Sequence, residues 1–280
     1  LRVDPNTGNR TLVSSMGVDA NDNPTGNAGP FAGFYRNAQV FNGGILASSS
    51  FGSLVTVDPV TGDRSLFAGG GSGPAPGATG IAIAGNNIYV SNNYTTANTP
   101  STISQVDALT GARTINSGAG VGNGPSLNIP NQLLLDSSGS LLVAEFDGIL
   151  RIDPLTGVRS LISGGGVGTG PSTFGLTLGI LPSGSLITES FPLNANQDCQ
   201  ILSIDPSTGN RTILSDSAHG SGPELFWTGG LAVAPGVPEP TSLVLALLGG
   251  LSLLATCRRR WSNVFLSQVV AELRLLRIKP

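Results

Sequence analysis

Short apolar segments alternate with turns rich in glycine, serine and asparagine along the first 235 residues. Apolar and polar residues alternate strictly in Leu150-Arg151-Ile152 and again in Leu202-Ser203-Ile204. A period of two predicts half-buried strands. Residues 80–85 and 88–92 form a further predicted pair of strands joined by a short turn. The pattern therefore predicts an all-β protein made of many short strands.

One nine-residue string recurs along these strands, first as VDPNTGNRT at residues 3–11. Its aspartates recur at intervals of 46 to 54 residues, at Asp4, Asp58, Asp107, Asp153 and Asp205. Periods of about 40–50 residues are typical of four-stranded propeller blades. The units resemble those of the NHL and related six-bladed propeller families in length and strand order. We expect four whole units, at about 31–69, 79–118, 130–164 and 176–216. A split unit, from residues 1–15 and 229–235, makes the predicted count five blades, or six with residues that precede Leu1.

Within each unit the string is predicted to be the turn between the third and fourth strands. Its aspartate accepts hydrogen bonds from backbone N–H groups, and its proline presets φ for a type I turn. The glycine four residues after the aspartate takes a positive φ without steric cost. We expect the arginine six residues after the aspartate to reach back to it. A calcium site is the alternative, but calcium needs several carboxylates at one ion, and only the second copy adds another acid, Asp63.

Composition excludes several functional classes. Net charge is −3, and no basic cluster occurs before residue 257, so we expect no nucleic-acid partner. Two cysteines, Cys199 and Cys257, cannot build a disulfide framework or a cysteine zinc site. The glycine-rich links lack the lysine of a phosphate-binding loop and are predicted to be flexible crossings between blades. We expect neither a metal nor a cofactor, and His219, the one histidine, is predicted to be an exposed loop residue.

Polar residues at the ends of the predicted second strands form one candidate ligand face. They are Asn92, Glu145 with Asp147, and Glu189, in successive units. Equivalent strand ends can line one face of a propeller. A catalytic or metal-binding role for these residues is the alternative to a structural one, and on balance we expect no enzyme.

The composition changes abruptly at Gly236. Two prolines flank a glutamate in Pro238-Glu239-Pro240, an apolar stretch covers residues 242–255, and Arg258, Arg259 and Arg260 follow. The prolines favour an extended segment, the apolar stretch suits a bilayer although it is shorter than about 20 residues, and the arginines favour the cytoplasmic side. This three-part order closely resembles the PEP-CTERM sorting signal of Gram-negative and related bacteria.

The resemblance implies an exported protein that is tethered to the inner membrane through residues 242–255. It also implies processing by an exosortase-type enzyme and a final place at the cell surface or outside the cell, in an exopolysaccharide setting. The predicted domains are a propeller at 1–235, a sorting and transmembrane helix at 236–261, and an amphipathic basic tail at 262–280. The chain starts at Leu1 without a basic-then-apolar leader, so we expect a processed or truncated N-terminus.

These features together predict a non-catalytic binding or matrix-associated module for a polysaccharide or protein ligand. Two alternatives stay open at this point. One is a propeller lyase or lactonase that acts on a carbohydrate through Glu145, Asp147 and Glu189, and the other is a purely structural envelope protein.

Overall fold

The computed structural model describes most of the repeats. The described residues are 2–3, 10–11, 14, 29, 35–49, 53–67, 77–93, 100–172, 175–190, 199–221, 225, 231 and 233. The chain divides into two compact units, residues 1–233 and 234–280, and every described residue lies in the first. The fold is therefore that of the first unit.

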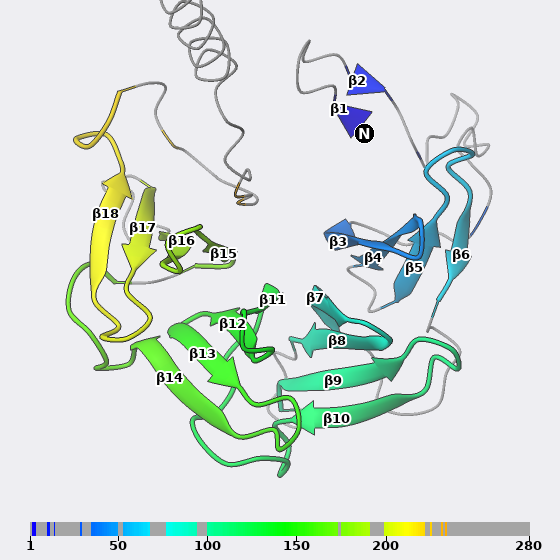
Figure 1. Cartoon of the computed structure of the whole chain (residues 1–280), viewed down its shortest axis with the longest axis horizontal. Coiled ribbons are helices and arrows are strands. Elements are labelled where there is room, and N and C mark those ends of the chain that lie inside the picture. The colour runs from blue at the N-terminus through cyan, green and yellow to red at the C-terminus, as the bar shows by residue number, and fades with distance from the viewer. Residues whose placement is uncertain are drawn as a thin grey trace, which may run out of the picture. The chain divides into compact units, whose positions relative to one another are not determined.

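Four antiparallel sheets, each of four strands, follow one another along the chain (Figure 1). The first blade comprises β3 (Tyr35–Phe41), β4 (Gly44–Ser49), β5 (Leu54–Val57) and β6 (Arg64–Leu66). The second comprises β7 (Ala78–Ala84), β8 (Asn87–Asn92), β9 (Thr102–Asp107) and β10 (Arg113–Ser117). The third comprises β11 (Leu133–Leu135), β12 (Leu141–Glu145), β13 (Gly148–Ile152) and β14 (Arg159–Gly164). The fourth comprises β15 (Gly179–Ile180), β16 (Leu186–Ser190), β17 (Gln200–Ile204) and β18 (Arg211–Ser215).

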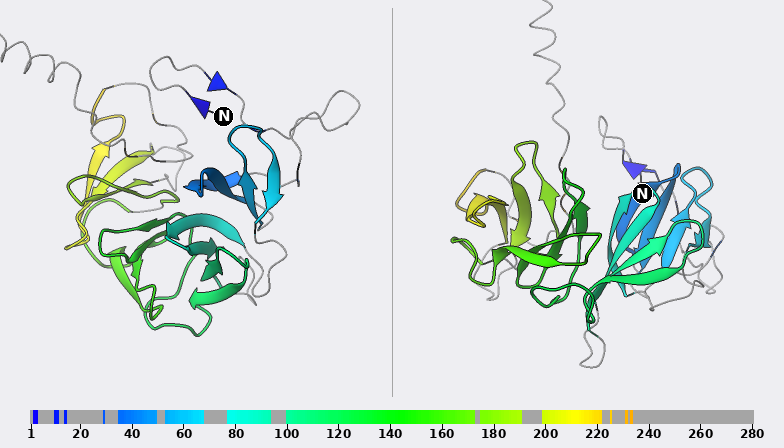
Figure 2. Two further views of the ribbon diagram at one scale, coloured as in Figure 1. Left: turned by 45° about the vertical axis from the view of Figure 1, so that its right-hand side comes forward. Right: turned by 60° about the horizontal axis from the view of Figure 1, so that its bottom comes forward.

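Each blade is a meander, because the order of strands in the sheet is their order in the sequence. The prediction of an all-β propeller is confirmed, and the described residues form four complete blades. A two-stranded hairpin of β1 (Arg2–Val3) and β2 (Arg10–Thr11) precedes them. It lies on the side of the first blade in both views of Figure 2.

Two further predictions fall mainly or wholly outside the described residues. The strand expected at 229–235 is described only at Leu231 and Val233, and neither is in a strand. The expected C-terminal helix lies wholly beyond the described part. Within that part, no helix has the length and apolar character needed to span a membrane.

The hydrophobic core lies between neighbouring sheets. Leu141 and Val143 of β12 pack in a cluster with Ala82 and Tyr89 of the second blade. Alternate residues of the same strand, Leu142 and Ala144, pack in a cluster with residues of the fourth blade. Because successive side chains of a strand point to opposite faces, a strand between two neighbouring sheets must be apolar on both. This explains why all five residues of β12 are buried.

Candidate functional site

The repeated string forms the same turn in each of the four blades. In the fourth blade, Asp205 Oδ1 accepts hydrogen bonds from Ser207 N at 2.9 Å and from Ser207 Oγ at 2.7 Å, while Asp205 Oδ2 accepts one from Thr208 Oγ1 at 2.8 Å. Gly209 N donates to Asp205 O at 2.8 Å, and Gly209 has a φ of 75°. These hydrogen bonds lower the pKa of Asp205, with the bonds from Ser207 contributing most. The turn interpretation of the string is therefore confirmed.

Strand pairing shows that all five copies share one register. The residue before each aspartate lies opposite the arginine six residues after that aspartate. The pairs are Val3 with Arg10, Val57 with Arg64, Val106 with Arg113, Ile152 with Arg159 and Ile204 with Arg211. The pairing of β1 with β2 thus has the same register as that of the third and fourth strands in the four blades.

The arginine of the string does not act as the sequence suggested. Arg211 Nη1 donates to Ser163 Oγ at 2.8 Å, and Arg211 Nε donates to Pro171 O at 2.6 Å. Ser163 is the last residue but one of β14 in the preceding blade, and Pro171 lies in the link that follows β14. The prediction that the arginine reaches back to its own aspartate is wrong here, because strand pairing directs its side chain across the seam to the neighbouring sheet. Arg159 makes the matching contacts with Ser117 and Pro125.

The glycine-rich links are closely packed where they are described, so they are not merely flexible crossings. Gly164 and Val167 exchange two backbone hydrogen bonds, of 2.8 and 3.1 Å. A Cβ on Gly170 would lie 2.1 Å from Arg211 O, and Gly170 has a φ of 115°. Only glycine lets the link pass this close to the next blade.

Asn92 and Glu145 end the second strands of their blades and are both buried, with 0% and 4% of their surface exposed. Asn92 Oδ1 accepts a hydrogen bond from Gly77 N at 3.0 Å, and Glu145 Oε2 accepts one from Asn128 N at 3.0 Å. Both side chains therefore hold the backbone that leads into the first strand of their own blade. Glu189 is also buried, but it is the last residue but one of β16. Its place in the register matches that of Ala144, and Ser190 holds the place that matches Glu145, so Glu189 does not belong to the same set as Asn92 and Glu145.

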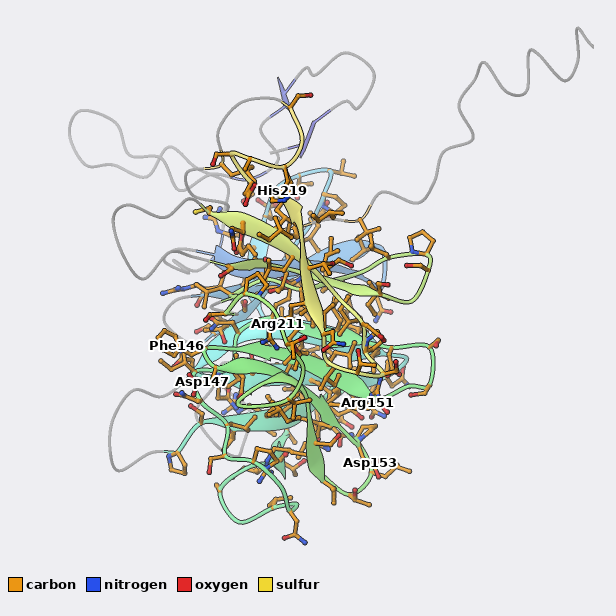
Figure 3. All side chains as sticks on the ribbon, turned by 90° about the vertical axis from the view of Figure 1, so that its left-hand side faces the viewer. Phe146, Asp147, Arg151, Asp153, Arg211 and His219 are labelled. Carbon is orange, nitrogen blue, oxygen red and sulfur yellow. The ribbon has the colours of Figure 1, made fainter. Side chains whose placement is uncertain are left out.

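Burial raises the pKa of Glu145 to about 7, and the charge of Asp147 adds to the rise. The hydrogen bond from Asn128 N and the charge of Arg159 act in the opposite direction. Asp147 itself is exposed, and its Oδ2 accepts a hydrogen bond from Asn128 Nδ2 at 2.5 Å. Figure 3 shows Phe146 and Asp147 at one edge of the molecule and Asp153 of the repeated turn away from them. Glu145 and Asp147 are thus two neighbouring carboxylates of the third blade whose charges interact.

Sequence reasoning missed an acidic partner of His219. Asp216 Oδ1 lies 2.7 Å from His219 Nδ1 and also accepts hydrogen bonds from the backbone of Ala218 and His219. These contacts lower the pKa of Asp216, with the His219 side chain as the largest cause. His219 is exposed, as predicted. The sequence does carry a signal for this pair, because Asp216 stands three residues before His219, just after a predicted strand.

Within the described ranges, no group of three or more histidine, cysteine, aspartate or glutamate residues is placed to hold a metal ion. Pro238, Glu239 and Pro240, the apolar stretch at 242–255, and Arg258, Arg259 and Arg260 all lie outside those ranges. The candidate ligand face thus remains the only predicted site whose residues the structure describes.

No protein-family model matches the chain, and neither does any curated protein. Solved β-propeller structures are similar to it in fold. The extracellular domain of a candidate one-component system from Bacteroides thetaiotaomicron is 10% identical, with a TM-score of 0.46 over 70% of this chain and 23% of that one. A YCF48 protein bound to a D1 peptide is 10% identical, with a TM-score of 0.47 over 66% and 54%. A candidate glucose dehydrogenase-type oxidoreductase from Thermus thermophilus is 13% identical, with a TM-score of 0.45 over 60% of each chain. This chain spans less than two thirds of each, and the likeness is one of fold.

Proposed function

We propose that this chain is an exported β-propeller that binds a polysaccharide or protein ligand without catalysing a reaction on it. One observation carries the non-catalytic part. Asn92 and Glu145 occupy equivalent places in neighbouring blades, and each uses a side-chain oxygen to hold a backbone N–H of its own blade. Side chains committed to the scaffold in this way leave a rigid platform for binding rather than a converging set of reactive groups.

The full chain tests this proposal on an array of neutral and acidic bacterial surface glycans, with a parallel pull-down from a cell-envelope extract. We expect saturable binding to one glycan class or one envelope protein. The absence of both would contradict the binding role and leave a structural envelope role as the better description.

Export is supported by the tail sequence. Pro238-Glu239-Pro240, the apolar residues 242–255 and three consecutive arginines from Arg258 have the order of a PEP-CTERM signal. We propose that an exosortase-type enzyme recognises the proline-flanked segment while the apolar stretch holds the precursor in the membrane.

Expression of the tagged full chain with and without an exosortase tests this assignment. We expect a shorter surface form only when the enzyme is present, and no shortening when Glu239→Gln is combined with Pro238→Ala. Glu272→Gln, a change of the same type outside the motif, is the control. Normal processing of the motif variant would overturn the assignment.

A fifth blade is supported by the hairpin of β1 and β2. Ser14 Oγ donates to Gly62 O at 2.7 Å and accepts from Arg64 Nη1 at 2.8 Å. Ser163 makes the same two contacts with Gly209 and Arg211 at a seam between complete blades. On the other side of the molecule, Val233 Cγ2 lies 3.0 Å from the place that a Cβ on Gly179 would take. We propose that the hairpin and the predicted strand at 229–235 contribute to one blade.

A carbohydrate lyase or lactonase is the second candidate, and one observation favours it. The pKa of Glu145, at about 7, suits a general acid or base at neutral pH. Incubation of the full chain with uronic-acid polysaccharides and with sugar lactones tests this candidate. Turnover that Glu145→Gln abolishes would establish it in place of the binding role.

A further inference from the structure

A pocket of about 460 Å³ opens at the seam between the first and second blades. Its walls include Phe41 at the end of β3 and Phe67 just after β6. Asp58, Asp63 and Arg64 of the repeated turn line another part, and Ala108 of the next blade's turn lines the far side. Ligand pockets commonly have volumes of about 300–1,000 Å³, so this one is large enough for a small molecule.

The pocket lies where the repeated units differ from one another. The residue after the aspartate is proline in four copies, whereas Ala108 stands there in the third. The residue nine after the aspartate is Phe67 in the first blade and Asn116 in the second. At the next seam Asn116 Nδ2 donates to Pro154 O at 2.8 Å, so the two equivalent positions meet there. At the first seam the same two positions hold Phe67 and Ala108, and alanine lacks the ring that proline would place there.

A third departure from the other copies lines the same pocket. The residue five after the aspartate is an acid only in the second copy, as Asp63. Asp63 is thus the only acid at its position, Phe67 the only aromatic residue at its position, and Ala108 the only replacement of the proline, and all three line one pocket. A turn that only needs to reverse the chain has no use for this convergence, whereas a binding site does.

The lining combines apolar and polar groups. The rings of Phe41 and Phe67 pack edge to face, with centroids 5.7 Å apart. The hydrogen bonds from Val60 N and Thr61 N lower the pKa of Asp58, so its carboxylate is charged at neutral pH. Both of those bonds end on Oδ1, and a carboxylate has acceptor sites on both oxygens. Arg64 is held in place by Ser14 and is only 8% exposed.

We propose that this pocket binds a neutral saccharide of one or two pyranose rings. A pyranose has an apolar C–H face that suits the aromatic wall and hydroxyl groups that donate to carboxylates and accept from a guanidinium. Two carboxylates against one guanidinium disfavour an acidic sugar. The proposal rests on the binding role proposed above and assigns it to one seam of the propeller.

Two variants restore the residues of the other copies and therefore preserve the turn. Ala108→Pro adds a ring to the wall and narrows the pocket, and Asp63→Asn removes the second carboxylate while matching Asn9 and Asn210. Phe67→Ala removes part of the aromatic wall. Pro154→Ala makes the reverse change at the seam between the second and third blades and is the matched control.

Isothermal titration of the full chain with cellobiose, maltose and lactose tests the proposal, with glucuronic acid and spermidine as charged comparators. We expect one neutral disaccharide to bind, and Ala108→Pro and Phe67→Ala each to weaken it by about tenfold or more, which corresponds to about 1.4 kcal/mol. Asp63→Asn weakens it less, and Pro154→Ala leaves it unchanged.

The outcomes separate this proposal from the broader one. Glycan or protein binding by the full chain that Ala108→Pro and Phe67→Ala leave unchanged overturns the pocket and leaves the binding role standing. Binding of spermidine, but of no disaccharide, with loss in Ala108→Pro overturns the saccharide chemistry. Absence of any ligand for the wild-type chain overturns both proposals.

Discussion

Arg211 Nη1 lies 2.8 Å from Ser163 Oγ and joins the fourth blade to the third. Ser163 in turn donates to Gly209 O at 2.7 Å, so one buried hydroxyl is both acceptor and donor across the seam. Ser117 with Arg159 and Ser14 with Arg64 repeat the relationship at two other seams. In three of the strings the arginine therefore joins neighbouring sheets as well as pairing within its own hairpin.

Ser163→Ala tests how much these hydrogen bonds between blades contribute to stability. The change removes two hydrogen bonds of one buried hydroxyl, while Arg211 Nη1 keeps its contacts with Val167 O and Gly209 O. Each lost hydrogen bond contributes about 0.5–1.5 kcal/mol, so the two together contribute about 1–3 kcal/mol. We expect the free energy of unfolding to fall by that amount in urea denaturation monitored by circular dichroism. Ser160→Ala, an exposed change in the same strand, is the control and is expected to stay within about 0.5 kcal/mol of wild type.

Gly157→Ala tests the close approach of neighbouring blades. Gly157 has a φ of 71°, and a Cβ there would lie 2.2 Å from Asn116 O. We expect a loss of about 3 kcal/mol or more, because strain and a backbone clash act together. Gly139→Ala has similar strain, with a φ of 81°, but meets open space, and we expect a loss of about 1 kcal/mol. Equal losses in thermal denaturation would contradict the packing account.

The raised pKa of Glu145 predicts that the stability of the fold depends on pH. Its pKa is about 7 in the folded chain against 4.5 ordinarily, so between these values the folded state keeps a proton that the unfolded chain has released. The free energy of unfolding therefore falls as pH rises through this window, by about 3 kcal/mol at most. Glu145→Gln should flatten the dependence and be more stable than wild type above pH 7.

Asp147→Asn supplies the companion measurement. Asp147 raises the pKa of Glu145 in the folded chain, so removal of its charge should make the loss of stability smaller and end it at a lower pH, with the same onset. Urea midpoints across the same window measure both variants. A wild-type profile as flat as that of Glu145→Gln would show that Glu145 is ionised with an ordinary pKa.

The proposed fifth blade predicts one more hydrogen bond between a serine and an arginine of neighbouring blades. At three seams the serine ten residues after one aspartate contacts the arginine six residues after the next aspartate, whereas alanine replaces that serine after Asp58. Continued around the ring, this rule pairs Ser215 with Arg10. In a double-mutant cycle of Ser215→Ala and Arg10→Ala we expect a coupling of about 1 kcal/mol. Ser215→Ala combined with Arg64→Ala is the control and should show additive losses.

The repeated string revealed the all-β repeat architecture without any structure. Its glycine, proline and aspartate act locally, so their roles follow from sequence alone, and the four described turns have the predicted hydrogen bonds. The limits of the four whole units were also close to those of the blades, because apolar segments of four to six residues between turns leave little freedom for where strands begin and end.

Contacts between blades were decided only by the tertiary structure. Arg159 and Arg211 were expected to pair with nearby aspartates, yet their partners lie 34 to 48 residues away. Asn92 and Glu145 looked like a ligand face, whereas burial committed them to backbone amides. The pocket beside Ala108 exists because side chains from two blades meet at a seam. A sequence determines local turns through nearest-neighbour chemistry, whereas partners across a seam depend on how whole sheets pack.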